Sequence, residues 1–208
     1  MAQPGLTALE ARDLSRIAAF TDGVMAVAIT LLVLNLEVPT LEPGQSLGDA
    51  LVDLIPSVGA YVLAFALVGR FWVIHHNLFE KLLGFDRTLM TLNLCFLALI
   101  VLVPFATDLY DVYTREALAA AVLGATLGLA ALTNWAMNRH VLRRGFVHED
   151  RREETAVFAA PIGLGFTAAF LLSVPAAFLS VHIAEALWIS TVVLRYPLRR
   201  LGGRTSSR

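Results

Sequence analysis

Charged residues are scarce in this chain. Only 16% of its 208 residues are Asp, Glu, Lys or Arg, whereas a soluble domain carries about 25%. Hydrophobic residues make up 57%, so a soluble protein of this size would have too little polar surface to cover its apolar mass. Intrinsic disorder is excluded, because disordered chains are poor in apolar residues. The shortage of charge therefore indicates a membrane protein.

Cysteine and the common catalytic motifs are also missing. The single cysteine, Cys95, excludes a disulfide within the chain and any Cys-x-x-Cys metal or redox motif. The formal net charge of −1 gives no basic surface, so no nucleic-acid partner is expected. No Ser–His–Asp set, phosphate-binding glycine loop or Walker motif is found. We therefore expect no enzymatic activity and no cofactor.

Long apolar runs fill most of the sequence. A helix that crosses a bilayer core needs about 20 apolar residues, and unbroken runs favour helices over the alternating strands of a barrel. The sequence predicts an all-α membrane protein in which residues 1–208 form one domain with six transmembrane helices. The expected spans are Ile17–Leu36, Leu54–Ile74, Leu89–Thr107, Ala117–Met137, Ala156–Phe178 and the shorter Ile183–Leu198.

Basic residues alternate from one connection to the next. The connection that carries Lys81 and Arg87 is basic, as is the stretch from Arg139 to Arg152, whereas the loop from Glu37 to Asp53 has acids and no Lys or Arg. Both terminal segments are basic. By the positive-inside rule, both termini and the two basic loops are cytoplasmic. These signals predict a multi-pass protein of the cell membrane.

The first predicted span carries an apolar stripe and an acid. At about 100° per residue, Val27, Leu31 and Leu34 share one narrow face, with Thr30 at its edge. Asp22 lies within the bilayer, about 140° from Val27. An ionisable group there normally faces protein or water, so Asp22 is either an anchor to neighbouring helices or an ion ligand. Its position away from the stripe favours the anchor.

Polar side chains on the next two spans lie at a depth similar to that of Arg16 and Asp22. They are Trp72, His75, His76, Asn77 and Asn93. A cluster of this composition can satisfy its own donors and acceptors away from water. His75, His76 and Glu80 do not form the His-Glu-x-x-His motif, and adjacent histidines on a helix point about 100° apart. We therefore expect no metal site.

Three segments together resemble a known family. The first helix reads Arg16-x-x-x-Phe20-Thr21-Asp22-Gly23-Val24 followed by Ala26–Leu34, the second contains Phe71-Trp72-x-x-His75-His76-Asn77, and the third contains Asn93 and Pro104-Phe105. This pattern is similar to the prokaryotic homologues of the endolysosomal potassium channel (transmembrane protein 175). Where that family usually has Phe-Ser-Asp, this chain has Thr21, which keeps the hydroxyl group.

The resemblance implies a homotetramer of six-helix subunits in which the first helices line a central pore. K⁺ is then the permeant ion, and it passes apolar rings instead of a carbonyl filter. Matched by position, the rings are Val27, Leu31 and Leu34, with Thr30 as a nearby hydroxyl. The usual first constriction residue is Ile or Leu, so the smaller Val27 is expected to widen the pore and weaken selectivity.

The resemblance also assigns a polar network that ties the pore helix to the second and third helices. Its members would be Arg16, Phe20, Thr21, Asp22, Trp72, His75, His76 and Asn93. Which of the two histidines takes part is left open by the sequence. The same ionisable groups support an alternative, a proton-coupled secondary transporter with Asp22 and His75 or His76 as a titrating relay.

Overall fold

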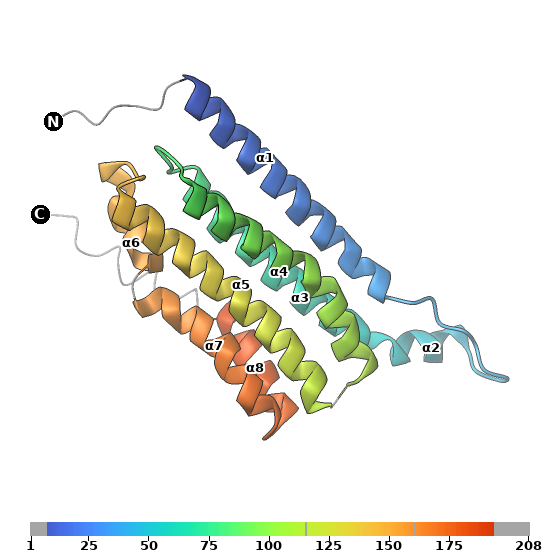
Figure 1. Cartoon of the computed structure of the whole chain (residues 1–208). Coiled ribbons are helices and arrows are strands. Elements are labelled where there is room, and N and C mark those ends of the chain that lie inside the picture. Colours follow the sequence, from blue (N-terminus) through green and yellow to red (C-terminus); the bar gives the residue numbers. More distant parts are fainter. Residues whose placement is uncertain (1–7, 115, 160, 194–208) are drawn as a thin grey trace, which may run out of the picture.

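The computed structural model describes residues 8–114, 116–159 and 161–193, which are almost entirely helical (Figure 1). Apart from one isolated bridge, these residues contain no β-structure. The elements follow in the order α1 (Ala8–Leu31), η1 (Leu32–Asn35), α2 (Leu47–Asp53), α3 (Ile55–Phe79), α4 (Arg87–Val112), α5 (Ala117–Arg144), η2 (Glu149–Arg151), α6 (Arg152–Ala159), α7 (Pro161–Ala177) and α8 (Val181–Val193).

Four helices are long and apolar enough to cross a membrane: α1 together with η1, then α3, α4 and α5. Two further apolar helices, α7 and α8, are shorter. The prediction of an all-α membrane protein is therefore confirmed. In lipid, the internal hydrogen bonds of helices satisfy backbone groups that have no water to bind.

The predicted fifth span corresponds to α6, which reaches Ala159, and α7, which runs from Pro161 to Ala177. The residue between them lies outside the described part of the chain. The predicted sixth span begins within α8, and its last residues lie outside the described part of the chain.

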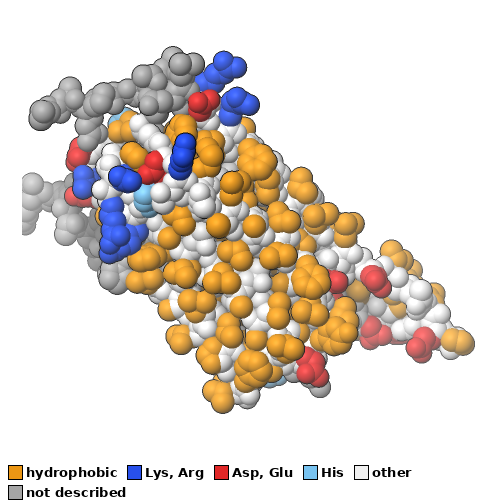
Figure 2. Space-filling model, in the orientation of Figure 1, with side chains coloured by type: hydrophobic (Ala, Val, Ile, Leu, Met, Phe, Trp, Pro, Cys, Tyr) orange, Lys and Arg blue, Asp and Glu red, His pale blue; other side chains and the backbone are white. Residues whose placement is uncertain are grey.

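The helices form a bundle in which α1 occupies one edge. Figure 1 shows α3 and α4 between α1 and α5, with α7 and α8 on the side opposite α1. The connections after α3 and α5 meet at one end, and those after α1, α4 and α7 lie at the other. Basic side chains gather at the first end and acidic ones around α2 at the second, with an apolar surface between them (Figure 2).

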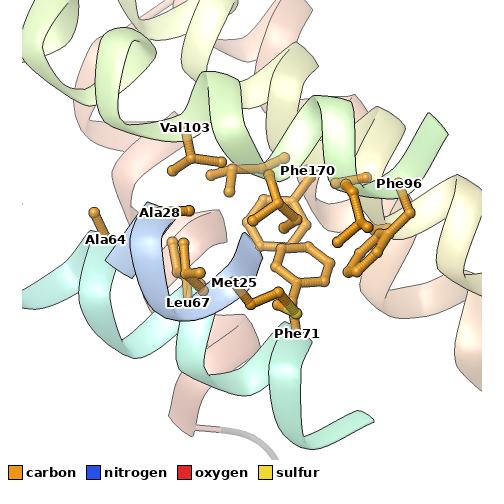
Figure 3. Close-up of a cluster of buried hydrophobic side chains, with 14 of the residues drawn as sticks. Met25, Ala28, Ala64, Leu67, Phe71, Phe96, Val103 and Phe170 are labelled. Atoms are coloured by element: carbon orange, nitrogen blue, oxygen red, sulfur yellow. The ribbon is translucent and has the colours of Figure 1, made fainter. Parts of the chain in front are cut away.

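One part of the core lies between α1, α3, α4 and α7 (Figure 3), and α5 and α8 contribute further buried side chains to the same cluster. Phe71 of α3 is fully buried, and its ring packs 6.0 Å from that of Phe96 and 6.2 Å from that of Phe170. From α1, only the face with Met25 and Ala28 enters this cluster. One side of α1 is thus fixed by packing, and the other side has no packing partner among the described residues.

The turn between α3 and α4 is fastened to the end of α5. Leu82 and Val147 form a short antiparallel bridge, and the Leu83 N–H donates to the Phe146 carbonyl at 2.8 Å.

Asp86 caps α4 by accepting from the Leu89 N–H at 2.8 Å. The same carboxylate lies 2.9 Å from His140 Nε2 and 3.4 Å from Arg144 Nε, both on α5.

Replacing Asp86 is expected to weaken the attachment of α4 to α5 and to lower the free energy of unfolding. Burial alone would raise the pKa of the Asp86 carboxyl, but the bond from the Leu89 N–H and the neighbouring His140 and Arg144 outweigh it, so the pKa lies below its usual value. Asp86→Ala should cost about 1–2 kcal/mol, the usual value of an N-cap, measured by chemical unfolding in detergent. Because the folded pKa is lowered, the stabilisation is present above about pH 4 and fades as the pH falls further.

The matched control is Asp53→Ala at the end of α2, where an exposed carboxylate accepts one bond from Gln45. A surface change of this kind is expected to stay within about 0.5 kcal/mol. Equal losses in the two variants would mean that Asp86 contributes no more than an ordinary surface acid.

Candidate functional site

The unpartnered face of α1 is the candidate site. Its apolar side chains are exposed to different degrees: Val27 by 57%, Leu31 by 38% and Leu34 by 70%. Gly23 has open space where a Cβ would stand. The structure therefore brings the predicted stripe residues onto one continuous exposed line at the edge of the subunit.

Thr30 lies beside this line and is exposed. Its hydroxyl donates to the Val27 carbonyl of the same helix at 2.8 Å. Because the hydroxyl proton is used within the helix, the lone pairs of the oxygen are left to accept from water or to face a cation.

A buried chain of side-chain hydrogen bonds holds the opposite face of α1. The Asn93 amide of α4 donates to Thr21 Oγ1 at 2.9 Å, and the Asn93 carbonyl oxygen lies 2.8 Å from His75 Nε2 on α3. Thr21 is 0% exposed, and His75 and Asn93 are each 1% exposed. The His75 ring stacks on Phe79 and Phe96. Three helices thus meet at one fully buried polar link.

Asp22 belongs to a second, more exposed group. Its carboxylate accepts from the Trp72 indole N–H at 2.9 Å, and the Trp72 ring stacks on that of His76 with centroids 5.1 Å apart. His76 in turn lies 3.1 Å from Glu80. The two adjacent histidines therefore have separate surroundings. An indole nitrogen only donates, so Trp72 cannot pass a proton from Asp22 toward His76.

Arg16 and Phe20 lie next to the buried link. They line an open pocket of about 340 Å³ between α1 and α4, whose walls also include Asn93, Met90 and Leu94. Among the described residues, no hydrogen bond joins Arg16 to Asp22, Thr21 or the two histidines. In the structure, the predicted network therefore consists of a buried link, a separate and partly exposed group of Asp22, Trp72 and His76, and an open pocket that shares Asn93 with the link.

Sequence reasoning missed one contact at the other end of the helix. Asn35, the last residue of η1, donates its side-chain amide to the Pro104 carbonyl of α4 at 3.0 Å. A polar residue at the end of an apolar stripe was the only signal, and no periodicity indicates a partner 69 residues away.

The described residues offer little for metal or covalent chemistry. None of their His, Cys, Asp and Glu side chains form a group of three that could hold a metal ion. What the site does present is an apolar exposed ridge on one face of α1 and polar attachments on the other. Such a helix is suited to line a passage once copies of the ridge face one another.

Comparison with known proteins gives consistent results. A family model described as the endosomal/lysosomal potassium channel TMEM175 matches residues 16–104. A potassium channel of Streptomyces collinus is 36% identical over 176 residues, which cover 82% of this chain and 85% of the relative. A potassium channel of Chamaesiphon minutus is 34% identical over 191 residues, covering 86% and 94%.

A solved structure and animal relatives extend the comparison. The crystal structure of a lysosomal potassium-selective channel TMEM175 homolog from Chamaesiphon minutus superposes with a TM-score of 0.78 at 28% identity, covering 88% of this chain and 96% of that one. The endosomal/lysosomal proton channel TMEM175 of Gallus gallus is 35% identical over 109 residues, only 22% of its length. The resemblance inferred from the motifs is confirmed: this multi-pass membrane protein belongs to the TMEM175 family of ion channels.

Proposed function

We propose that this chain is one subunit of a passive, potassium-selective cation channel, a homotetramer with α1 of each copy around the central pore. The exposed line of Val27, Leu31 and Leu34 on the edge helix carries the proposal. Closed cyclic symmetry turns each of these side chains into a ring. The relatives that cover most of the chain are named potassium channels.

Conduction through such rings depends on hydration. A narrow apolar constriction closes by dewetting, and an ion that enters it loses part of its hydration shell. Selectivity then follows the different dehydration costs of K⁺ and Na⁺, and the Thr30 hydroxyl oxygen offers partial compensation beside the rings. Because Val27 is smaller than Ile or Leu, we expect a weak to moderate preference for K⁺.

The two ends of the bundle fit a cation channel in a cell membrane. Acids in and after the α1–α2 connection concentrate cations at the outer mouth; they are Glu37, Glu42, Asp49 and Asp53. The basic end would face the cytoplasm with both termini. The buried link of Thr21, Asn93 and His75 then holds the pore helix against α3 and α4 on the cytoplasmic side.

Flux from proteoliposomes tests the proposal. Purified tetramer in a K⁺ gradient should carry K⁺ without saturation, and Na⁺ more slowly. Saturable flux that requires a pH gradient would instead favour the transporter that uses Asp22 and His75 or His76. Proton flux without K⁺ flux would place the chain with its animal relatives that are named proton channels, and no flux from folded tetramer would overturn the channel proposal.

A further inference from the structure

The pore helix changes its geometry at its outer end. Regular α-helix ends at Leu31, and Leu32–Asn35 continue as a 3₁₀ turn that closes with the Leu36 N–H on the Val33 carbonyl at 3.1 Å. In a 3₁₀ helix, residues three apart eclipse one another, with a rise of about 2 Å per residue. Leu34 therefore stands directly above Leu31, about 6 Å further along the axis. An α-helix would turn Leu34 by about 60° from Leu31, to within about 20° of Val27, and place it about 4.5 Å further along the axis.

The resulting spacing is even. Val27 and Leu31 are separated by one α-helical turn of four residues, which is about 6 Å. The 3₁₀ turn gives Leu31 and Leu34 the same separation of about 6 Å with only three residues. The direction of Leu34, the last side chain of the stripe, thus depends on the 3₁₀ turn Leu32–Asn35, whose hydrogen-bond geometry is poorer than that of an α-helix.

Two side-chain contacts hold this turn in place. Leu32 is completely buried against the bundle, and Asn35 donates to the Pro104 carbonyl at 3.0 Å. Pro104 and Asn93 lie 11 residues apart on α4, and at about 100° per residue this returns to nearly the same face. One face of α4 therefore holds the pore helix at both ends, through Thr21 at the inner end and Asn35 at the outer end.

We propose that Asn35 is a positioning residue for ion selection: its bond to the Pro104 carbonyl fixes the 3₁₀ turn and thereby sets the width of the ring formed by Leu34. The inference rests on the proposed channel function. Asn35 itself is half-buried beside α4 and acts on the ion through Leu34 alone. Without the bond, the turn relaxes toward α-helix, Leu34 turns by about 60° relative to Leu31 and draws back by about 1.5 Å along the axis, and the width of the outer ring changes with it.

The test is a double-mutant cycle on the K⁺/Na⁺ permeability ratio of reconstituted channels. Asn35→Leu puts in place of the amide a side chain of similar size that has no hydrogen-bond donor. It should lower the ratio by about threefold, the equivalent of one hydrogen bond of average strength in a membrane protein. Asn35→Ser, whose hydroxyl is too short to span the distance, should do the same and replaces Asn35→Leu if that variant does not assemble. In a Leu34→Ala background, either change should have no further effect.

A purely structural role for Asn35 would lower stability and leave the ratio unchanged in the intact channel, which would overturn the inference. Additive effects of Asn35→Leu and Leu34→Ala would also overturn it, because Asn35 would then not act through Leu34. The control is Gln45→Leu, which removes an amide bond to Asp53 in the same outer region without touching α1. Loss of selectivity in that control would contradict a specific role. Absence of K⁺ flux in the unmodified protein overturns the proposed function itself.

Discussion

Leu31→Ala channels are expected to lose about tenfold in K⁺/Na⁺ permeability ratio, which corresponds to ~1.4 kcal/mol in relative barrier height. The substitution removes three side-chain carbons from every subunit of the proposed ring, so the constriction widens and fills with water. An ion then keeps more of its hydration shell, and the difference in dehydration cost between K⁺ and Na⁺ shrinks. Reversal potentials under mixed K⁺ and Na⁺ gradients measure the ratio directly, and K⁺ conductance should rise in the same recordings.

The matched control is Leu172→Ala on α7. Leu172 is also an exposed leucine on an apolar helix, but α7 lies on the side of the bundle opposite α1. The control channel should keep the selectivity of the unmodified protein. If Leu31→Ala behaved like Leu172→Ala, the exposed ridge of α1 would face lipid and the pore would have to lie elsewhere.

Asn93→Leu is expected to have the largest effect on stability among the site residues. It removes the bond to Thr21 and the bond to His75 together, and both partners are left buried. The average hydrogen bond in a membrane protein contributes only about 0.6 kcal/mol, whereas an unpaired buried polar group costs about 1–3 kcal/mol. Because the three residues are at most 1% exposed, water cannot replace the lost partners and the larger cost should apply.

Unfolding in detergent measures this loss. Gating should change as well, because one of the two polar attachments of α1 to α4 is lost. Thr21→Val breaks only one of the two bonds and should cost less. The double variant should lose less free energy of unfolding than the sum of the two single variants, since the residues form one network.

The control is Thr91→Leu on the same helix, where an exposed hydroxyl donates only to the Arg87 carbonyl of its own helix. If Asn93→Leu lowered the free energy of unfolding no more than Thr91→Leu, the buried link would not contribute to stability.

Much of this protein follows from its sequence. Apolar runs in a chain with few charges must lie in lipid as helices, because no other open structure pairs its backbone groups there. The stripe of Val27, Leu31 and Leu34 could be found from the helical repeat alone, since residues three and four apart share a face. The motif around Asp22 was sufficient to place the chain in its family.

The tertiary structure decided what the helical repeat could not. The sequence left open which histidine joins the network; His75 lies by Asn93, while the adjacent His76 stacks on Trp72. Their difference depends on the rotation of α3 about its axis, which packing against α1 and α4 sets. The bond between Asn35 and Pro104 joins residues 69 positions apart, and the 3₁₀ turn it accompanies has no signature in hydrophobic periodicity. Local patterns fix which faces are apolar, whereas the partner of each polar side chain exists only once helices distant in sequence have docked.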